Sequence, residues 1–316
     1  MRRKTAVVAL GGNAIIKKSD QDTIATQFQN TRESLRGIVE LIRDGYNLAI
    51  THGNGPQVGN AILRVELARG KAPILPLGIC VADTEGGMGY MIEQSLQNRL
   101  EKEGIKRDVV TIVTQVIVDK DDPSTKEPTK FIGQFYTKKE AKKFAKERDW
   151  VVREDRGKMW RRVVPSPIPL EIVEKKTVKN LVEKGVIVIA AGGGGVPVYV
   201  EKDGTLEGMD AVIDKDRASA ILARDIGAEL LVILTEVERV ALNFGTLLQI
   251  DLDKMTMEEA KKYQKEGHFP PGSMGPKIEA AIAFLESGGK EVIITSIPKA
   301  YDAVKKKIAG TRIVLK

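Results

Sequence analysis

Short apolar runs rich in β-branched residues alternate along the chain with longer segments whose apolar residues recur at helical spacing. The short runs predict strands at 7–10, 48–51, 109–114, 186–191, 230–234 and 292–295. The longer segments predict helices over 26–43, 58–69, after Gly89, over 171–184, after Asp216, from about Met257 and after Pro276. This alternation is typical of parallel strands joined by crossover helices.

Local signals sharpen three of these elements. The helix near Gly89 carries an apolar stripe that predicts a buried face: Met88, Ile92, Leu96 and Leu100. The helix after Pro276 shows i, i+3, i+4, i+7 spacing: Ile278, Ala281, Ile282 and Leu285. Asp203-Gly204 predicts a hairpin-like turn between a strand at 198–200 and the segment that reaches 212–213.

The sequence changes character between Asp119 and Pro169. Five prolines, two tryptophans and dense charge interrupt the alternation of strands and helices there. We therefore predict that 119–169 is an inserted lobe rather than another crossover unit. The core is then formed by 1–118 and 170–316.

Three of the predicted strands end in glycine-rich loops. These loops are Gly11-Gly12-Asn13, Gly53-Asn54-Gly55 and Gly192 to Gly195. Glycine allows backbone N–H groups to approach a ligand closely, which suits phosphate or another oxyanion at strand ends. One such loop is commonly only a tight turn, whereas three together indicate a binding site.

Composition limits the classes of protein that need to be considered. The chain has 316 residues, of which 42% are hydrophobic and 29% are charged, enough for one large α/β domain or two smaller ones. It has no apolar run near the ~20 residues of a membrane helix and no signal-peptide pattern before the first strand, so we expect a soluble, cytoplasmic protein without membrane contact. Cys80 is the single cysteine, which excludes an intrachain disulfide and a thiolate metal site.

The basic net charge of +7 raises the question of nucleic-acid binding. Lysine and arginine are mixed with acidic residues in segments such as 138–148 and 171–184, as on solvated helix faces. Composition therefore argues against a nucleic-acid partner. A positive field does suit small anionic substrates.

Familiar phosphate-binding motifs are absent, but three lysines stand in loop-like contexts. No Walker A string occurs, and the first glycine loop lacks the spacing of a dinucleotide fingerprint. The lysines are Lys130, Lys215 and Lys277. Positive charge that converges with glycine amides is what phosphoryl transfer requires, since its transition state spreads negative charge over the transferred group. Each lysine could alternatively be only an exposed charge.

Five strings of the sequence strongly resemble the carbamate kinases, a family of the amino-acid kinase superfamily. The strings are VALGGNA at 8–14, THGNGPQVG at 51–59, PTK at 128–130, VIDKD at 212–216 and GSMGPK at 272–277. The resemblance implies an α/β fold, a three-layer αβα sandwich with an open, mainly parallel central sheet and a protruding subdomain at 119–169. It also implies a homodimer, a place in arginine metabolism, and reversible transfer between ATP and carbamate that gives ADP and carbamoyl phosphate with Mg²⁺.

The resemblance also assigns roles to individual residues. The expected catalytic residues are Lys130, Lys215, Lys277 and Asp216, with Asp216 orienting the lysines. The expected substrate and phosphate residues are Gly11, Gly12, Asn13, Gly53, Asn54 and Gly55. The expected nucleotide residues are Asp214, Thr235, Asn243, Phe244, Gly245, Met274 and Gly275. We expect no metal-binding side chains, with Mg²⁺ held by ATP phosphates and water. His52 is expected to brace its loop, and His268 is expected to lie at the surface or in a loop.

Some positions separate this chain from its relatives. Acetylglutamate kinases place a lysine before Leu-Gly-Gly, where this chain has Ala9, and we expect Lys130 to supply the missing charge. Glu236 stands where the family more often has Asp, and 82–86 departs from the usual Gly-Ala-x-Ser-Gln-Gly. Two alternatives stay open, namely another amino-acid kinase with a different acceptor and a non-catalytic nucleotide or anion sensor.

Overall fold

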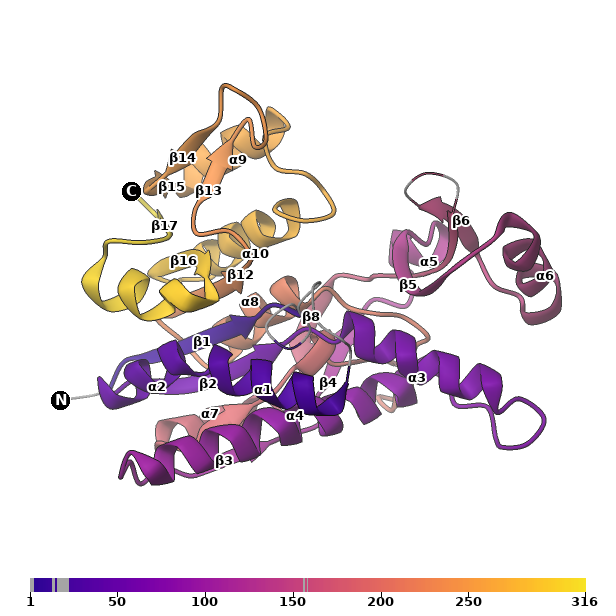
Figure 1. The fold of residues 1–316 in the computed structure, drawn as a ribbon, viewed down its shortest axis with the longest axis horizontal. Helices are drawn as coiled ribbons and strands as arrows, with labels where there is room; N and C mark the ends of the chain where they lie inside the picture. The colour runs from indigo at the N-terminus through magenta and orange to yellow at the C-terminus, as the bar shows by residue number, and fades with distance from the viewer. Residues whose placement is uncertain (1–2, 13–14, 16–22, 156, 158) are drawn as a thin grey trace.

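A central sheet organises the part of the chain that the computed structural model describes, which is residues 3–12, 15, 23–155, 157 and 159–316 (Figure 1). Its strand order is β15-β17-β16-β12-β1-β2-β9-β3. The strands are β1 (Thr5–Leu10), β2 (Asn47–His52), β3 (Val109–Thr111), β9 (Ile187–Ile189), β12 (Leu230–Thr235), β15 (Lys254–Thr256), β16 (Glu291–Ser296) and β17 (Thr311–Val314). Neighbouring strands are parallel except for β16 and β17.

Helices cover both faces of this sheet. Side chains of β1 alternate between the faces, so that Val7 and Ala9 join one buried cluster and Val8 joins the other. The first cluster contains residues of α7 (Lys175–Glu183), α8 (Lys215–Asp225), α9 (Met257–Lys265) and α10 (Gly275–Glu286). The second contains residues of α2 (Arg36–Arg43) and α4 (Leu77–Lys102), and α1 (Ile24–Ser34) lies beside α4. The expected three-layer αβα sandwich with a mainly parallel sheet is confirmed.

A smaller sheet and several short elements complete the core. The smaller sheet has the order β11-β10-β4-β8, formed by β4 (Gln115–Val118), β8 (Pro169–Ile172), β10 (Val196–Val200) and β11 (Leu206–Gly208). The antiparallel pairing of β10 with β11 agrees with the turn expected at Asp203-Gly204. The remaining elements are the hairpin β13 (Val240–Leu242) and β14 (Ile250–Leu252) and the short helices η2 (Gly192–Gly194), η3 (Ile297–Lys299) and η4 (Asp302–Lys306).

The inserted segment forms its own sheet and projects away from the core (Figure 1). It contains α5 (Pro123–Lys126), β5 (Lys130–Tyr136), α6 (Lys138–Arg148), β6 (Val152–Asp155) and β7 (Met159–Val164), with strand order β5-β7-β6. Three of its aromatic side chains pack together, since the centroid of the Phe144 ring lies 5.1 Å from that of Tyr136 and 5.4 Å from that of Trp150. The segment contacts α3 (Gly55–Leu67), where Arg148 forms an ion pair with Glu66 at 2.7 Å. The division of the chain at 119 and 169 stays a prediction.

Three of the predicted helices differ clearly from the structure, and the strands predicted over 109–114 and 186–191 are shorter, as β3 and β9. The helix expected over 26–43 is divided into α1 and α2 at Leu35. Just before this point the Thr31 hydroxyl donates a hydrogen bond to the Gln27 carbonyl, and such a bond within a helix often bends it. The helix expected over 171–184 begins only at Lys175, because β8 pairs with β4 up to Ile172. Helix α4 begins at Leu77, well before Gly89.

Helix α4 also carries the predicted stripe. Met88, Ile92, Leu96 and Leu100 are all buried. No helix in the described ranges has both the length and the apolar character needed to cross a bilayer.

Packing of α10 against the sheet provides a test of this core. Phe284 is 1% exposed, and its replacement by alanine should lower the free energy of unfolding by about 3–5 kcal/mol because it leaves a cavity. Phe244 is 59% exposed, so Phe244→Ala should change that free energy by no more than about 0.5 kcal/mol. Chemical denaturation followed by circular dichroism measures both, and equal effects of the two substitutions would contradict this packing.

Candidate active site

The glycine-rich loops meet at one edge of the central sheet because β1, β2 and β9 are adjacent parallel strands. Gly11 donates its N–H to the Leu234 carbonyl, and Gly53 donates to the Leu10 carbonyl, both at 3.1 Å. A Cβ on Gly53 would lie 3.1 Å from the Gly12 nitrogen and 3.5 Å from Cδ of Lys215. The first two loops therefore touch each other and the stem of one of the predicted lysines. Asn13 lies outside the described residues.

The third loop, Gly192–Gly195, packs against the second. Gly193, Gly194 and Gly195 have φ values of 65°, 101° and 83°, a region that favours glycine. A side chain on Gly193 would clash with the Asn54 amide, and a Cβ on Gly194 would lie 2.5 Å from the Ile213 carbonyl oxygen. This loop therefore fills the space between Asn54 and the chain just before Asp214.

Three lysines from three elements converge on two aspartates. Lys215, in the first turn of α8, contacts Asp216 Oδ1 through Nζ at 2.5 Å. Lys277, in the first turn of α10, contacts Asp216 Oδ2 at 3.1 Å and donates to the Ser273 carbonyl at 3.2 Å. The four expected catalytic residues thus lie in one cluster together with Asp214.

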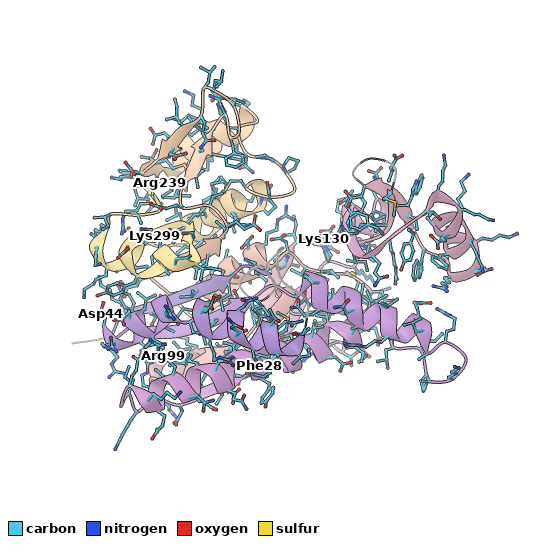
Figure 2. All side chains as sticks on the ribbon, viewed as in Figure 1. Phe28, Asp44, Arg99, Lys130, Arg239 and Lys299 are labelled. Carbon is cyan, nitrogen blue, oxygen red and sulfur yellow. The ribbon has the colours of Figure 1, made fainter. Side chains whose placement is uncertain are left out.

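Lys130 reaches this cluster from the inserted segment (Figure 2). Its Nζ lies 2.9 Å from Asp214 Oδ2, and its side chain keeps 36% exposure, more than Lys215 or Lys277. The other oxygen of Asp214 accepts the Asp216 N–H at 2.9 Å and so caps the N-terminus of α8. Asp214 therefore joins the inserted segment to the helix that carries Lys215.

Both aspartates are held in the charged form. Burial alone would raise the pKa of Asp214, but Lys130 and Lys215 lower it to about 2. For Asp216, burial again opposes ionisation and Asp214 does so too, yet Lys215 and Lys277 hold the pKa below its ordinary value. The cluster is therefore a network of two carboxylates and three ammonium groups, in which Asp216 is buried and Lys130 keeps partial exposure.

A cavity of about 180 Å³ adjoins the cluster on the side of Lys277. Three of the expected nucleotide residues line it, namely Thr235, Phe244 and Met274. Its wall also includes Glu236, Arg239, Ser273 and His268. Phe244 is exposed rather than packed in the core, which leaves its ring free to contact a ligand.

Three further expected nucleotide residues are chain neighbours of residues that line this cavity. Asn243 and Gly245 flank Phe244 in the loop between β13 and β14, and both have positive φ. Gly275 begins α10, and a Cβ there would lie 3.0 Å from the Pro270 carbonyl oxygen. Asp214 instead lines a second cavity of about 600 Å³, with Lys130, Arg217 and Pro276, between the inserted segment and the core.

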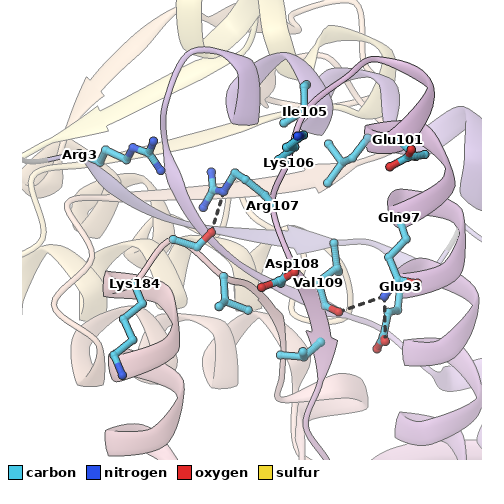
Figure 3. A pocket seen from close by; sticks show the side chains of 14 residues that line it. Arg3, Glu93, Gln97, Glu101, Ile105, Lys106, Arg107, Asp108, Val109 and Lys184 are labelled. Carbon is cyan, nitrogen blue, oxygen red and sulfur yellow. Dashed lines mark hydrogen bonds between the residues drawn. The ribbon is translucent and has the colours of Figure 1, made fainter.

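A larger cavity, of about 890 Å³, lies elsewhere, along β3 and α4 (Figure 3). Arg107 faces it and donates to the carbonyls of Tyr46 at 2.5 Å and Gly185 at 2.7 Å. Burial, with a contribution from Arg3, lowers the pKa of Arg107 to about 10. None of the expected site residues that the structure describes lines this cavity, so its size does not make it the candidate site.

His52 ends β2 beneath the glycine loops and is 1% exposed. Burial lowers its pKa to about 4, Lys215 adds to this, and a hydrogen bond to the Gly53 carbonyl opposes it. The ring is therefore neutral at pH 7, which agrees with a bracing residue rather than a charged group. His268 lines the nucleotide-side cavity and packs edge-on to Tyr263.

Nothing in the described ranges forms a metal-binding cluster of three or more His, Cys, Asp or Glu side chains. The oxygens of Asp214 and Asp216 already accept hydrogen bonds from lysines and backbone N–H groups.

Two polar residues of α4 near the loops were not singled out as site residues by the sequence. Thr84 accepts a hydrogen bond from the Asn54 side chain at 2.9 Å, and Glu85 accepts the Thr114 N–H at 3.1 Å. Glu85 precedes Met88 by three positions and so continues the buried stripe of α4. The position of an acidic residue on an apolar helix stripe was the signal in the sequence that could have identified Glu85.

Comparison with known proteins places the chain in a family. The model of the amino acid kinase family matches residues 4–296. The chain belongs to the amino acid kinase family. It is 49% identical to the carbamate kinase of Pyrococcus horikoshii over 309 residues, which cover 97% of this chain and 98% of that protein.

Further comparisons agree with this placement. The chain is 47% identical to the carbamate kinase of Clostridium perfringens over 98% of its length and 99% of that protein. The solved structure of a Giardia lamblia carbamate kinase bound to AMP-PNP superposes with a TM-score of 0.93 at 41% identity, and the match covers 99% of this chain and 98% of that one. This member of the amino acid kinase family is therefore an enzyme of the carbamate kinase group.

The pairing of Asp216 with two lysines predicts a measurable loss of stability. Asp216→Asn should lower the free energy of unfolding at pH 7 by about 3–5 kcal/mol, because two ammonium groups lose a buried partner. The lowered pKa means that this stabilisation is present at neutral pH and is lost as the pH falls through the folded-state pKa. Asp253→Asn, at an 83% exposed side chain, is the control, and equal denaturation midpoints for the two variants would refute the prediction.

A pH titration of the His52 ring tests whether its pKa is lowered. The folded-state pKa lies below the ordinary 6.5, so the unfolded chain binds more protons between pH 6.5 and 4, and stability falls as the pH is lowered through that window. In proton NMR, the ring signals that disappear in His52→Gln should keep their neutral positions until the pH approaches 4. A midpoint near 6.5 for those signals would show that the ring is solvated.

Proposed function

We propose that this enzyme catalyses reversible phosphoryl transfer between ATP and carbamate, which gives ADP and carbamoyl phosphate. One observation carries the proposal: Lys130, Lys215 and Lys277 meet at the edge of the sheet where the glycine loops end. The names of the relatives supply the acceptor, and the AMP-PNP bound to the Giardia protein supports ATP as the donor.

The chemistry needs charge stabilisation rather than a protein nucleophile. A carbamate oxygen attacks the γ-phosphorus, an O–P bond forms, and the bond to the β,γ-bridging oxygen breaks with its electron pair leaving on ADP. The attacking oxygen is already anionic, so the protein need not remove a proton. Negative charge spreads over the transferred group, and fixed cations and N–H donors lower the barrier.

Each part of the cluster has a proposed role in this step. Lys215 and Lys277 offset charge on the β- and γ-phosphates, and Asp216 orients both ammonium groups. Lys130 closes on the acceptor side from the inserted segment. The glycine amides of 11–12 and 53–55, with the Asn54 amide, hold the transferred group and the carbamate.

The nucleotide would extend from the cluster into the cavity lined by Thr235, Phe244 and Met274. Asn243 and Gly245 would shape the loop that presents Phe244, and Gly275 would let α10 begin close to the phosphates. We include Mg²⁺ in the proposal as an ion held mostly by nucleotide phosphates and water. The resemblance further supports a homodimer that works in the cytoplasm in arginine metabolism.

ATP formation from ADP, Mg²⁺ and carbamoyl phosphate tests the proposal directly. The wild-type protein should produce ATP faster than the uncatalysed control, and Lys130→Ala and Lys277→Ala should each lose about 10²–10³-fold in rate because a charge that stabilises the transition state is removed. Lys139→Ala and Lys290→Ala, at exposed positions, are the matched controls and should retain the wild-type rate.

Two outcomes would overturn the proposal in different ways. Without ATP above the uncatalysed control, carbamoyl phosphate is not the substrate, and ATP with acetylglutamate, UMP and other acceptors would be examined next. With ATP formation unaffected by the Lys130 and Lys277 substitutions, the enzyme would be a carbamate kinase whose charge stabilisation lies elsewhere.

A further inference from the structure

The loop Gly192–Gly195 lies between two parts of the site, the loop that carries Asn54 and the segment that leads to Asp214. The proposed chemistry gives this loop no role. On one side Gly193 packs against the Asn54 amide, and on the other Gly194 packs against the carbonyl of Ile213, which directly precedes Asp214. No Cβ fits at either position. A displacement of this loop would therefore disturb the loop Gly53–Gly55, which we call the acceptor loop, or the lysine cluster at the start of α8, or both.

Glu85 lies beneath this loop and supports it from α4. It is 1% exposed, and its Oε2 accepts the Thr114 N–H at 3.1 Å. The Thr114 hydroxyl oxygen in turn accepts the N–H of Ala191, the residue before the loop, at 3.0 Å. A Cβ on Gly192 would lie 3.1 Å from Cγ of Glu85 and would clash with the His52 ring. Glu85 and His52 thus enclose Gly192 from two sides.

The surroundings of Glu85 disfavour a carboxylate. Burial, with Glu174 adding to it, raises the pKa of Glu85 well above its usual range, and the N–H groups of Thr114, Gly192 and Val196 oppose the shift without reversing it. The other titratable group across Gly192 is His52, which is neutral at pH 7. Oε1 of Glu85 is buried and has no hydrogen-bond partner among the described residues. A protonated carboxyl fits these surroundings better than an anion does.

We propose that Glu85 is a positioning residue for the transfer reaction, which holds Gly192–Gly195 in place and through it the Asn54 amide and the start of α8. This inference rests on the proposed function for its kinetic readout. Glu85 itself does not reach the substrate, since the loop covers it. Thr84, the preceding residue, binds Asn54 directly, so consecutive residues of α4 fix the acceptor loop from two directions.

Kinetics of two Glu85 variants test the proposal. Glu85→Gln keeps the shape and an uncharged head group and should retain the wild-type kcat and KM at pH 7. Glu85→Ala should lose about 10²-fold in kcat/KM for carbamoyl phosphate, because small displacements of binding groups have effects of this size. Glu101→Gln and Glu101→Ala, at an exposed position of the same helix, should behave like the wild type.

The pH dependence distinguishes this role from simple packing. At a pH above the raised pKa of Glu85, the carboxyl group of the wild type becomes a buried anion that Glu174 repels. The KM of the wild-type enzyme for carbamoyl phosphate should then rise. Glu85→Gln cannot ionise and should keep its KM over the same range. Superimposable alkaline profiles of the wild type and Glu85→Gln would overturn the role assigned to the uncharged head group.

Hydrogen exchange gives a readout that needs no activity. Amides of 191–196 should exchange faster in Glu85→Ala than in the wild type or Glu101→Ala, while amides in the middle of β1 should be unchanged. Unchanged exchange at 191–196 would reject the bracing role whatever the kinetics show. If the wild type forms no ATP while the loop still exchanges faster in Glu85→Ala, the proposed function fails and the bracing of the loop by Glu85 stands.

Discussion

The double ion pair of Asp216 is the interaction on which the arrangement of the site depends. A carboxylate in this position is stable only because two ammonium groups compensate for the water it has lost. Its two oxygens contact lysines from different helices, so the N-termini of α8 and α10 are held together through one side chain. Lys215 lies in addition against Gly53, which connects the same network to the end of β2. The strand order of the sheet and the ion pairs of Asp216 therefore bring the glycine loops and the lysines to the same edge of the sheet.

Much of the fold followed from the pattern of apolar residues, because buried parallel strands and amphipathic helices have distinct periods. The pattern indicated six strands of the central sheet, namely β1, β2, β3, β9, β12 and β16, but it missed the short strands β15 and β17. It also did not give the ends of helices, which depend on tertiary contacts. Strand β8 occupies residues expected to be helical because it pairs with β4, more than 50 positions earlier. The division of α1 from α2 involves a side-chain hydrogen bond of Thr31 that periodicity does not register.

The composition of the site was predictable, but of its connections only the pairing of Asp216 with lysines was expected. The motifs identified the three lysines, Asp216 and the glycine loops, and the structure brings the described members of this set to one edge of the sheet. The bond between Lys130 and Asp214, the exposure of Phe244 and the burial of Glu85 depend on the positions of distant segments. The place of Glu85 on the apolar stripe of α4 indicates burial, but it does not reveal which distant segments cover the side chain. The departure of residues 82–86 from the usual family sequence pointed to the segment that contains Glu85, but it did not indicate the role of that residue.

The cluster also constrains the order in which the protein can be completed. Lys130 and Asp214 are separated by 84 positions, and Asp216 and Lys277 by 61. A chain that emerges from the ribosome N-terminus first carries Lys130, Asp214, Lys215 and Asp216 before it carries the second cation that Asp216 requires. Contacts between distant positions also form slowly. The pocket for the transferred group therefore cannot be completed before α10 is synthesised, and shorter nascent chains hold only part of the charge balance.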